Sequence, residues 1–216
     1  MKLAVFDCDG TLVDGQAPVC DAMEAAFAQA GLPAPGRHAV RRIVGLSLPQ
    51  AVRALAPDAD PGRQAAAVDA YKIAFRAARE EGRLEEPLFA GIADLLGRLV
   101  DGGWTLAVAT GKSDRGLTGC LAGHGIEGHF ASLQTADRHP SKPHPAMLEA
   151  ALFETGARAE EAVMIGDTTF DMAMARAAGV RAVGVAWGYH AATELRTAGA
   201  EAVAADAEEL ETFLHG

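Results

Sequence analysis

Hydrophobic residues along the chain fall into short continuous runs and into helical spacings, and the two kinds of segment alternate over most of the sequence. Short, largely apolar runs that are typical of buried strands lie at 2–6, 105–109, 130–134, 162–165, 182–186 and 202–204. Helical spacings between and after these runs lie at 91–100, 114–122, 144–154, 169–178 and 208–214. Repeated strand–helix units with apolar strands predict an α/β fold, a doubly wound parallel sheet with helices on both faces and the strand at 2–6 near its centre.

One long segment interrupts this alternation. Between Val13 and Pro87 the spacing of apolar residues is helical throughout, at 16–30, 37–44, 48–55 and 62–80. We therefore expect an all-helical domain, residues 15–87, inserted into an α/β core made of residues 1–14 and 88–216. The two connections should lie near 13–17 and 84–88.

Composition narrows the possible functions. The chain has 216 residues, half of them hydrophobic, and a net charge of −10, so its long-range field repels nucleic acids and anionic membranes. Its three cysteines, Cys8, Cys20 and Cys120, lack metal-ligand spacing, which favours free thiols in a reducing compartment. No segment has the pattern of a signal peptide or the length of a membrane span, so we expect a cytoplasmic protein that binds neither nucleic acid nor membrane. The oligomeric state stays open, a monomer included.

Acidic residues follow two of the predicted strands. Asp7 and Asp9 end the first strand two positions apart, so both can project the same way, and Asp167 and Asp171 follow the strand at 162–165. Ligands of α/β sheets bind at the carboxyl ends of the strands. Four carboxylates gathered there would repel one another without a cation, and Mg²⁺ prefers such hard oxygen ligands. Each acid taken alone could instead close a turn or cap a helix.

Two further loops suit the binding of phosphate. Thr110-Gly111 follows the strand at 105–109 and offers a hydroxyl beside an unhindered backbone amide, although a threonine in this place can also cap a helix. Lys142 lies in Ser141-Lys142-Pro143-His144-Pro145, where the prolines restrict the backbone and fix where the lysine points.

Four segments, FDCDGTLVD, VATGK, SKPHPAMLEAA and IGDTTFDMAMARAAG, occur in this order and resemble the four motifs of the haloacid dehalogenase-like superfamily of phosphotransferases. The resemblance covers nearly the whole chain. The helical insert lies between the first and second motifs, where one branch of the superfamily has a helical cap domain. It implies a Rossmann-like core that hydrolyses a small phosphorylated metabolite through an aspartyl-phosphate on Asp7. It also implies that Asp9 protonates the leaving alcohol and then activates water. Dehalogenases of the superfamily lack this second acid, so its presence favours phosphate esters.

The resemblance implies a metal site as well. Asp7, the backbone carbonyl of Asp9 and Asp167 would hold Mg²⁺, while Asp171 would position a metal-bound water or Lys142. Metal and lysine together would let an anionic nucleophile approach an anionic ester.

Thr110 and the amide of Gly111 would hold the transferring phosphoryl group, with Lys142 neutralising its charge. Within the superfamily, the nearest resemblance is to phosphoglycolate phosphatase-like enzymes, because Arg42-Ile43-Val44-Gly45-Leu46 is similar to their cap loop. Arg42 and Gly45 are therefore candidate specificity residues. Arg42 could instead belong to the solvated face of a cap helix.

Two other functions compete with a phosphatase. A sugar-phosphate mutase like β-phosphoglucomutase would be expected to have a hinge histidine where Val19 stands and a basic residue where Val44 stands. A non-catalytic phosphate-binding or protein-interaction module would be expected to have lost one of the catalytic groups, all of which are present. Cys8, between the two acids, could itself be a nucleophile, but no histidine lies near it in the sequence.

Overall fold

The computed structural model describes residues 1–215, and its larger body is built on one parallel sheet. The six strands are arranged in the order β3-β2-β1-β4-β5-β6. Their bounds are β1 (Lys2–Phe6), β2 (Trp104–Thr110), β3 (Phe130–Thr135), β4 (Ala162–Gly166), β5 (Arg181–Val185) and β6 (Ala202–Ala204). The predicted α/β class and the central place of the first strand are confirmed, and each predicted strand agrees with the structure to within one residue.

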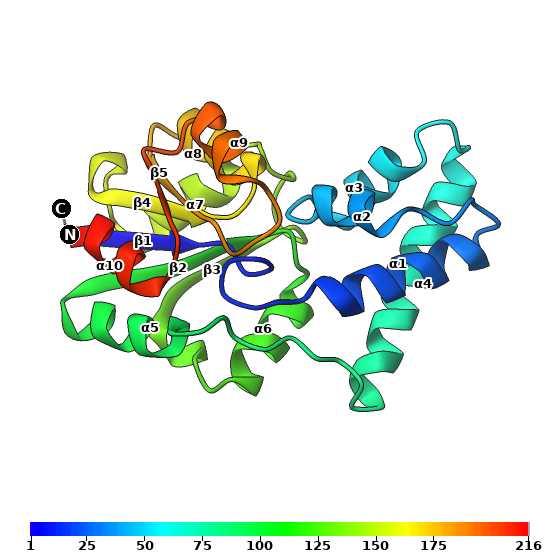
Figure 1. The fold of residues 1–216 in the computed structure, drawn as a ribbon, viewed down its shortest axis with the longest axis horizontal. Helices are drawn as coiled ribbons and strands as arrows, with labels where there is room; N and C mark the ends of the chain where they lie inside the picture. Colours follow the sequence, from blue (N-terminus) through cyan, green and yellow to red (C-terminus); the bar gives the residue numbers. More distant parts are fainter. Residues whose placement is uncertain (216) are drawn as a thin grey trace.

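Helices cover both faces of this sheet (Figure 1). One face packs against α5 (Ile92–Asp101), α6 (Asp114–Gly123) and α10 (Ala207–His215), and the other against α7 (Ala146–Thr155), α8 (Thr169–Ala177) and α9 (Ala192–Ala198). In β1, Ala4 and Phe6 belong to the first of these two cores, whereas Leu3 and Val5 belong to the second. Burial on both faces explains why this strand is a continuous apolar run without polar alternation.

The inserted segment forms a separate helical body at the end of the molecule away from both termini (Figure 1). It contains α1 (Gln16–Gln29), α2 (Arg37–Ile43), α3 (Leu48–Leu55) and α4 (Pro61–Glu80). These helices enclose a hydrophobic cluster of their own, in which Met23 and Phe27 of α1, Val40 of α2, Val52 of α3 and Ala67 of α4 are buried. We refer to this body as the cap; its boundaries at 14/15 and 87/88 stay a proposal.

The two chain segments that connect the cap to the core run side by side. Val13 and Leu88 form an antiparallel bridge, and the backbone N–H of Asp14 donates to the carbonyl of Pro87 at 2.8 Å. A further backbone bond joins the N–H of Phe89 to the carbonyl of Leu12 at 3.0 Å. The connections therefore form one hydrogen-bonded unit that enters the core next to the end of β1.

One helix of the core, α9, was not predicted. Its sequence, Ala192–Ala198, buries only Leu195, so it has no apolar periodicity to detect. Two short 3₁₀ turns, Glu127–His129 and Ala159–Glu161, were also missed. No helix among residues 1–215 combines the length and the apolar character needed to cross a membrane.

Candidate active site

The sheet topology brings the ends of β1 and β4 together. The two strands are neighbours, with Phe6 opposite Ile165, and the backbone N–H of Asp7 donates to the carbonyl of Ile165 at 2.9 Å. From β1 the strand order leads to β2 on one side and to β4 on the other, so the connections diverge at this point. Such a switch point leaves a crevice at the carboxyl ends of the strands. Asp7 and Asp167, which directly follow the two strands, are thereby placed at its base.

Three of the predicted acids lie close together there. One carboxylate oxygen each from Asp7, Asp167 and Asp171 lies within 4.8 Å of the others, and all three side chains are buried. Oδ2 of Asp7 is buried without a hydrogen-bond partner. Burial raises the pKa of Asp7 to about 7, and burial together with the charges of Asp7 and Asp171 raises the pKa of Asp167 well above its ordinary value. A partnerless acceptor among like charges fits a hard cation such as Mg²⁺.

Lys142 compensates part of this charge. Its Nζ lies 2.6 Å from Oδ1 of Asp171 and 2.9 Å from Oδ1 of Asp7, and its side chain is completely buried. Burial alone lowers the lysine pKa, but the two carboxylates raise it above its ordinary value, so the lysine stays charged. Asp171 also accepts from the backbone N–H and the hydroxyl of Thr168, at 3.0 and 2.6 Å, and so begins α8 as part of a capping box. Asp171 therefore caps α8 with one carboxylate oxygen and binds Lys142 with the other.

Asp167 is fixed by two residues, Thr11 and Tyr189, whose contact with it the sequence did not predict. Its Oδ1 accepts from the hydroxyl of Thr11, and its Oδ2 accepts from the backbone N–H of Tyr189, both at 2.9 Å. Gly10 lies beside the same carboxylate with φ +86°, and a Cβ there would lie 2.2 Å from Oδ2. Only glycine allows this turn and this approach. Gly10, which follows the two acids, was the signal in the sequence for this turn. Tyr189 was expected to pack a loop or to contact substrate, and its backbone contact with Asp167 was not predicted.

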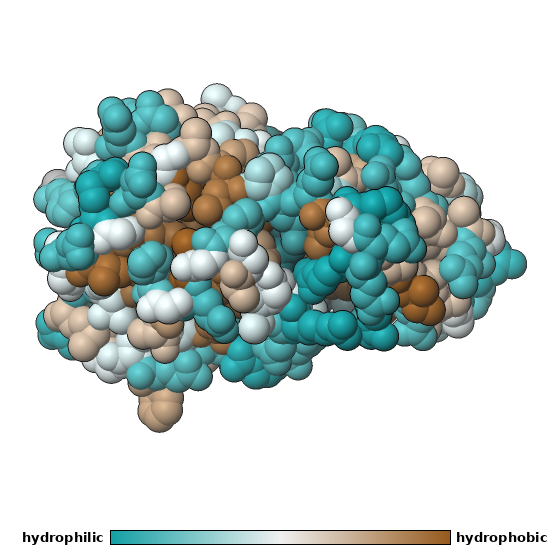
Figure 2. Space-filling model, turned by 90° about the horizontal axis from the view of Figure 1, so that it is seen from below, coloured by the Kyte–Doolittle hydropathy of each residue, from teal (hydrophilic) through white to brown (hydrophobic). Residues whose placement is uncertain are grey.

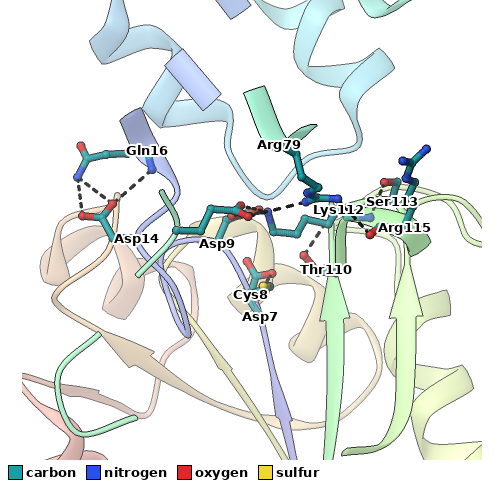
Figure 3. A network of polar contacts seen from close by, with 12 residues as sticks. Asp7, Cys8, Asp9, Asp14, Gln16, Arg79, Thr110, Lys112, Ser113 and Arg115 are labelled. Carbon is teal, nitrogen blue, oxygen red and sulfur yellow. Dashed lines mark hydrogen bonds and ion pairs between the residues drawn. The ribbon is translucent and has the colours of Figure 1, made fainter. Parts of the chain in front are cut away.

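A cavity of about 540 Å³ lies between the cap and the core. Its core side is lined by Asp7, Asp9, Thr110, Gly111 and Lys112, and its cap side by residues of α1, α3, α4 and the loop before α3. Figure 3 shows Asp7, Asp9, Thr110 and Lys112 at the ends of β1 and β2, below the cap. On the face seen in Figure 2, hydrophilic residues gather where the two bodies meet. The candidate nucleophile and the candidate phosphate loop therefore open into one space.

The cap loop rests directly on the phosphate loop. A Cβ on Gly111 would lie 2.6 Å from the carbonyl oxygen of Leu46 and 2.7 Å from that of Gly45. The backbone N–H of Ser47 donates to the hydroxyl of Ser141 at 2.7 Å. Gly45, a predicted specificity residue, thus lines the cavity next to Gly111. We refer to this arrangement, in which the cap loop contacts Gly111 and Ser141 of the core, as closed.

Arg42, the other predicted specificity residue, does not line the cavity within the described chain. Its guanidinium forms a bidentate ion pair with Glu194 of α9, with both N–O distances 2.8 Å. The carbonyl of Arg42 lies 3.1 Å from Nε2 of His190, whose Nδ1 accepts from the backbone N–H of Thr169. His190 therefore donates to the carbonyl. These contacts place Arg42 at the cap–core interface, and its role in specificity stays a prediction.

Asp9 pairs with Lys112, which in turn pairs with Glu86, and the sequence analysis predicted neither contact. Its Oδ1 lies 3.0 Å from Nζ of Lys112, and this ammonium lies 2.5 Å from Oε1 of Glu86. Burial, opposed by the charge of Lys112, raises the pKa of Asp9 above its ordinary value. Lys112 stood within a recognised motif, but nothing in the sequence paired it with Glu86, 26 positions away.

Cys8 does not have the surroundings of a nucleophile. The residue is completely buried and is not among the residues that line the cavity. A hydrogen bond with Cys120 and burial raise the pKa of its thiol well above the ordinary value, so the reactive thiolate is disfavoured.

Comparison with known proteins agrees with this geometry. The model of the haloacid dehalogenase-like hydrolase family matches residues 4–185. The probable phosphatase IndB of Dickeya dadantii is 38% identical over 91% of this chain and 86% of its own length. A phosphoglycolate phosphatase of Pectobacterium atrosepticum is 30% identical over 86% of this chain and 80% of its own. The crystal structure of a predicted phosphatase from Clostridium acetobutylicum, 24% identical, shares the fold with a TM-score of 0.89 over 99% of this chain and 98% of that one.

Proposed function

The chain is a phosphoric monoester hydrolase of the haloacid dehalogenase-like family, and we propose that it removes phosphate from a small phosphorylated metabolite through an aspartyl-phosphate intermediate, with Mg²⁺ as cofactor. One observation carries the proposal. A buried aspartate with a partnerless oxygen, Asp7, lies within 4.8 Å of two further acids and 2.9 Å from a buried lysine, and it opens into the cavity under the cap.

Asp7, Asp167 and the backbone carbonyl of Asp9 would hold the Mg²⁺, with Asp171 keeping Lys142 in place. The partnerless Oδ2 of Asp7 and the raised pKa of both Asp7 and Asp167, caused first by burial, support a cation at this place. The bound ion supplies positive charge that neutralises phosphate oxygens.

In the proposed reaction, a carboxylate oxygen of Asp7 attacks phosphorus, and the bond from phosphorus to the leaving alcohol breaks. Asp9 gives its proton to the departing oxygen, for which its raised pKa is suited. Water then attacks the phosphorus of the aspartyl-phosphate, Asp9 takes the proton of that water, and Asp7 is regenerated. Thr110 and the amide of Gly111 hold the transferring group, and Lys142 offsets its charge.

For the substrate, we propose a small phosphorylated acid or a sugar phosphate. One relative is named phosphoglycolate phosphatase, and the closed cap loop leaves a limited cavity of about 540 Å³ above Asp7. Val19, which stands where a mutase of the β-phosphoglucomutase type would have its hinge histidine, lines that cavity. The three free, buried cysteines agree with a reducing compartment, and we place the enzyme in the cytoplasm.

The test measures phosphate release from phosphoglycolate, several sugar phosphates and an aryl phosphate, with Mg²⁺ and with EDTA, beside glucose-phosphate isomerisation. We expect Mg²⁺-dependent release, no isomerisation, and complete loss of release in Asp7→Asn without a fall in thermal stability. Isomerisation would favour the mutase. A protein that releases phosphate from no ester would be a binding module, and the proposed function would be wrong.

A further inference from the structure

Glu86 and Lys112 converge on the carboxylate of Asp9, and we propose that they are positioning residues for proton transfer to the leaving group. Glu86, on the segment that returns from the cap to the core, holds Lys112, and Lys112 holds the Asp9 side chain toward the cavity. This inference rests on the proposed function, in which Asp9 is the general acid and base.

The three side chains form a buried ion-pair chain. Lys112 Nζ lies 3.0 Å from Oδ1 of Asp9 and 2.5 Å from Oε1 of Glu86. The side chains of Lys112 and Glu86 are each 7% exposed, and that of Asp9 is 11% exposed. Oδ1 of Asp9 has no hydrogen-bond partner among the described atoms, so the ion pair with Lys112 is the polar contact that it makes there. The orientation of this carboxylate therefore depends on the lysine. Figure 3 shows Lys112 extending from the end of β2 toward Asp9.

Glu86 is itself held from both bodies. Its backbone carbonyl lies 2.7 Å from Nε2 of His124, which directly follows α6 of the core. Its Oε2 lies 3.9 Å from Nη2 of Arg79, on α4 of the cap. From the same helix, the ring of Phe75 lies 5.6 Å from the Lys112 ammonium. Glu86 and Lys112 thus have their places set jointly by the core and the cap.

The first connection to the cap reaches the same carboxylate. A Cβ on Gly15 would lie 2.7 Å from Oδ1 of Asp9, so this glycine packs directly against the acid. Glu86 belongs to the second connection, and the two connections are hydrogen-bonded to each other at Asp14 and Pro87. The Asp9 side chain therefore lies where both connections meet. A change in either connection would alter the contacts that hold it.

A different role for Lys112 would be direct binding of the substrate phosphate, because the residue also lines the cavity. Its ammonium, however, already contacts two carboxylates. The two roles have different consequences. Loss of a phosphate-binding cation slows every phosphate ester, whereas a displaced general acid slows only those esters whose leaving group needs a proton.

The experiment uses Glu86→Gln, which removes the charge and keeps the shape. Single-turnover rates of alcohol release are compared for an alkyl phosphate that the wild-type enzyme hydrolyses and for nitrophenyl phosphate, whose leaving group departs without a proton. We expect about a 10- to 100-fold loss for the alkyl ester, smaller than the whole contribution of general acid–base catalysis, about 10²–10⁴-fold, because Asp9 is displaced and not removed. The release of nitrophenol should be nearly unchanged. Glu85→Gln is the matched control, because Glu85 is exposed, lies next to Glu86 and has no ion pair in the described chain.

Two further variants complete the test. In an Asp9→Asn background, Glu86→Gln should cause no additional loss, because the group that it positions is already gone. If Glu86→Gln fails to fold, Lys112→Arg replaces it, with the same expected difference between the two esters. Equal slowing of both esters, or of neither, overturns the inference. If Asp9→Asn alone treats both esters alike, the proposed role of Asp9 is wrong, whatever Glu86 does.

Discussion

Replacing Gly111 with alanine tests whether the closed cap loop is needed for activity. The Cβ of alanine would lie 2.6 and 2.7 Å from two backbone carbonyl oxygens of the cap loop, those of Leu46 and Gly45, and contacts under 3.0 Å force something to move. The backbone N–H that we assign to phosphate binding is retained in the variant. The substitution therefore acts on the approach of the cap and leaves the donor in place.

The size of the effect follows from the overlap. Overpacking by one methyl group costs about 1–3 kcal/mol in a packed interior. The cap loop relieves this cost by moving away from Gly111, so the closed arrangement loses about 1–3 kcal/mol relative to an open one. That difference lowers the ratio of closed to open molecules by about 5- to 150-fold. If hydrolysis requires closure, kcat/KM should fall by the same factor, while thermal stability changes little because the strain is released without unfolding.

The assay is steady-state phosphate release with the best substrate from the ester screen, beside a thermal melt. Gly123→Ala is the matched control, because it lies at the end of α6, where a Cβ meets nothing within 4 Å. We expect the control to keep wild-type kinetics. A Gly111→Ala enzyme within twofold of the wild-type kcat/KM would refute the need for closure.

Three further predictions concern buried and interfacial charge. Lys142→Met leaves Asp7 and Asp171 without their cation, so chemical denaturation should report a loss of about 3–5 kcal/mol in the free energy of unfolding. Burial raises the pKa of Asp7 from 3.8 to about 7, so the folded state binds this proton more tightly than the unfolded state does. In EDTA, the stability of the protein should therefore fall as the pH rises from 4 to 7. A melting temperature that rises over this range would contradict the prediction. Glu194→Gln removes the partly exposed ion pair with Arg42, and such pairs contribute little, so KM should rise by at most about fivefold. A larger rise would show that the pair contributes more than its exposure implies.

Much of the site could be predicted because its chemistry directly follows strands. The apolar runs before Asp7, Thr110 and Asp167 indicate buried strands, and parallel strands bring their carboxyl ends to one edge. This rule alone predicts that residues 160 positions apart meet, and the shared cluster of Asp7 and Asp167 agrees with it. The position of Lys142 depends in addition on a loop between strands, for which the flanking prolines and the motif resemblance were the guides.

Contacts made by backbone groups escaped prediction for a physical reason. Any non-proline residue can donate a backbone N–H, so the bond from Tyr189 to Asp167 leaves no trace in side-chain type. The same holds for the approach of the Gly45 and Leu46 carbonyls to Gly111, which depends on how the cap is docked. Gly111 could be seen in the sequence, but the need for a glycine there comes from the cap loop, which packs against it.

The pairing of Lys112 with Asp9 and Glu86 could not have been predicted, because the chain has 29 acidic and 19 basic residues and most charged side chains are solvated. The ion pairs of Lys112 with Asp9 and Glu86 differ from exposed ion pairs of the chain because all three side chains are largely buried. Removing three charges from water costs several kcal/mol per ion unless their contacts compensate, and apolar residues of similar size often stabilise a protein as well or better. Stability therefore gives little reason for the cluster. Its position, with one end at the carboxylate that faces the cavity and the other on the connection to the cap, is better explained by the need to orient that carboxylate when the cap is closed.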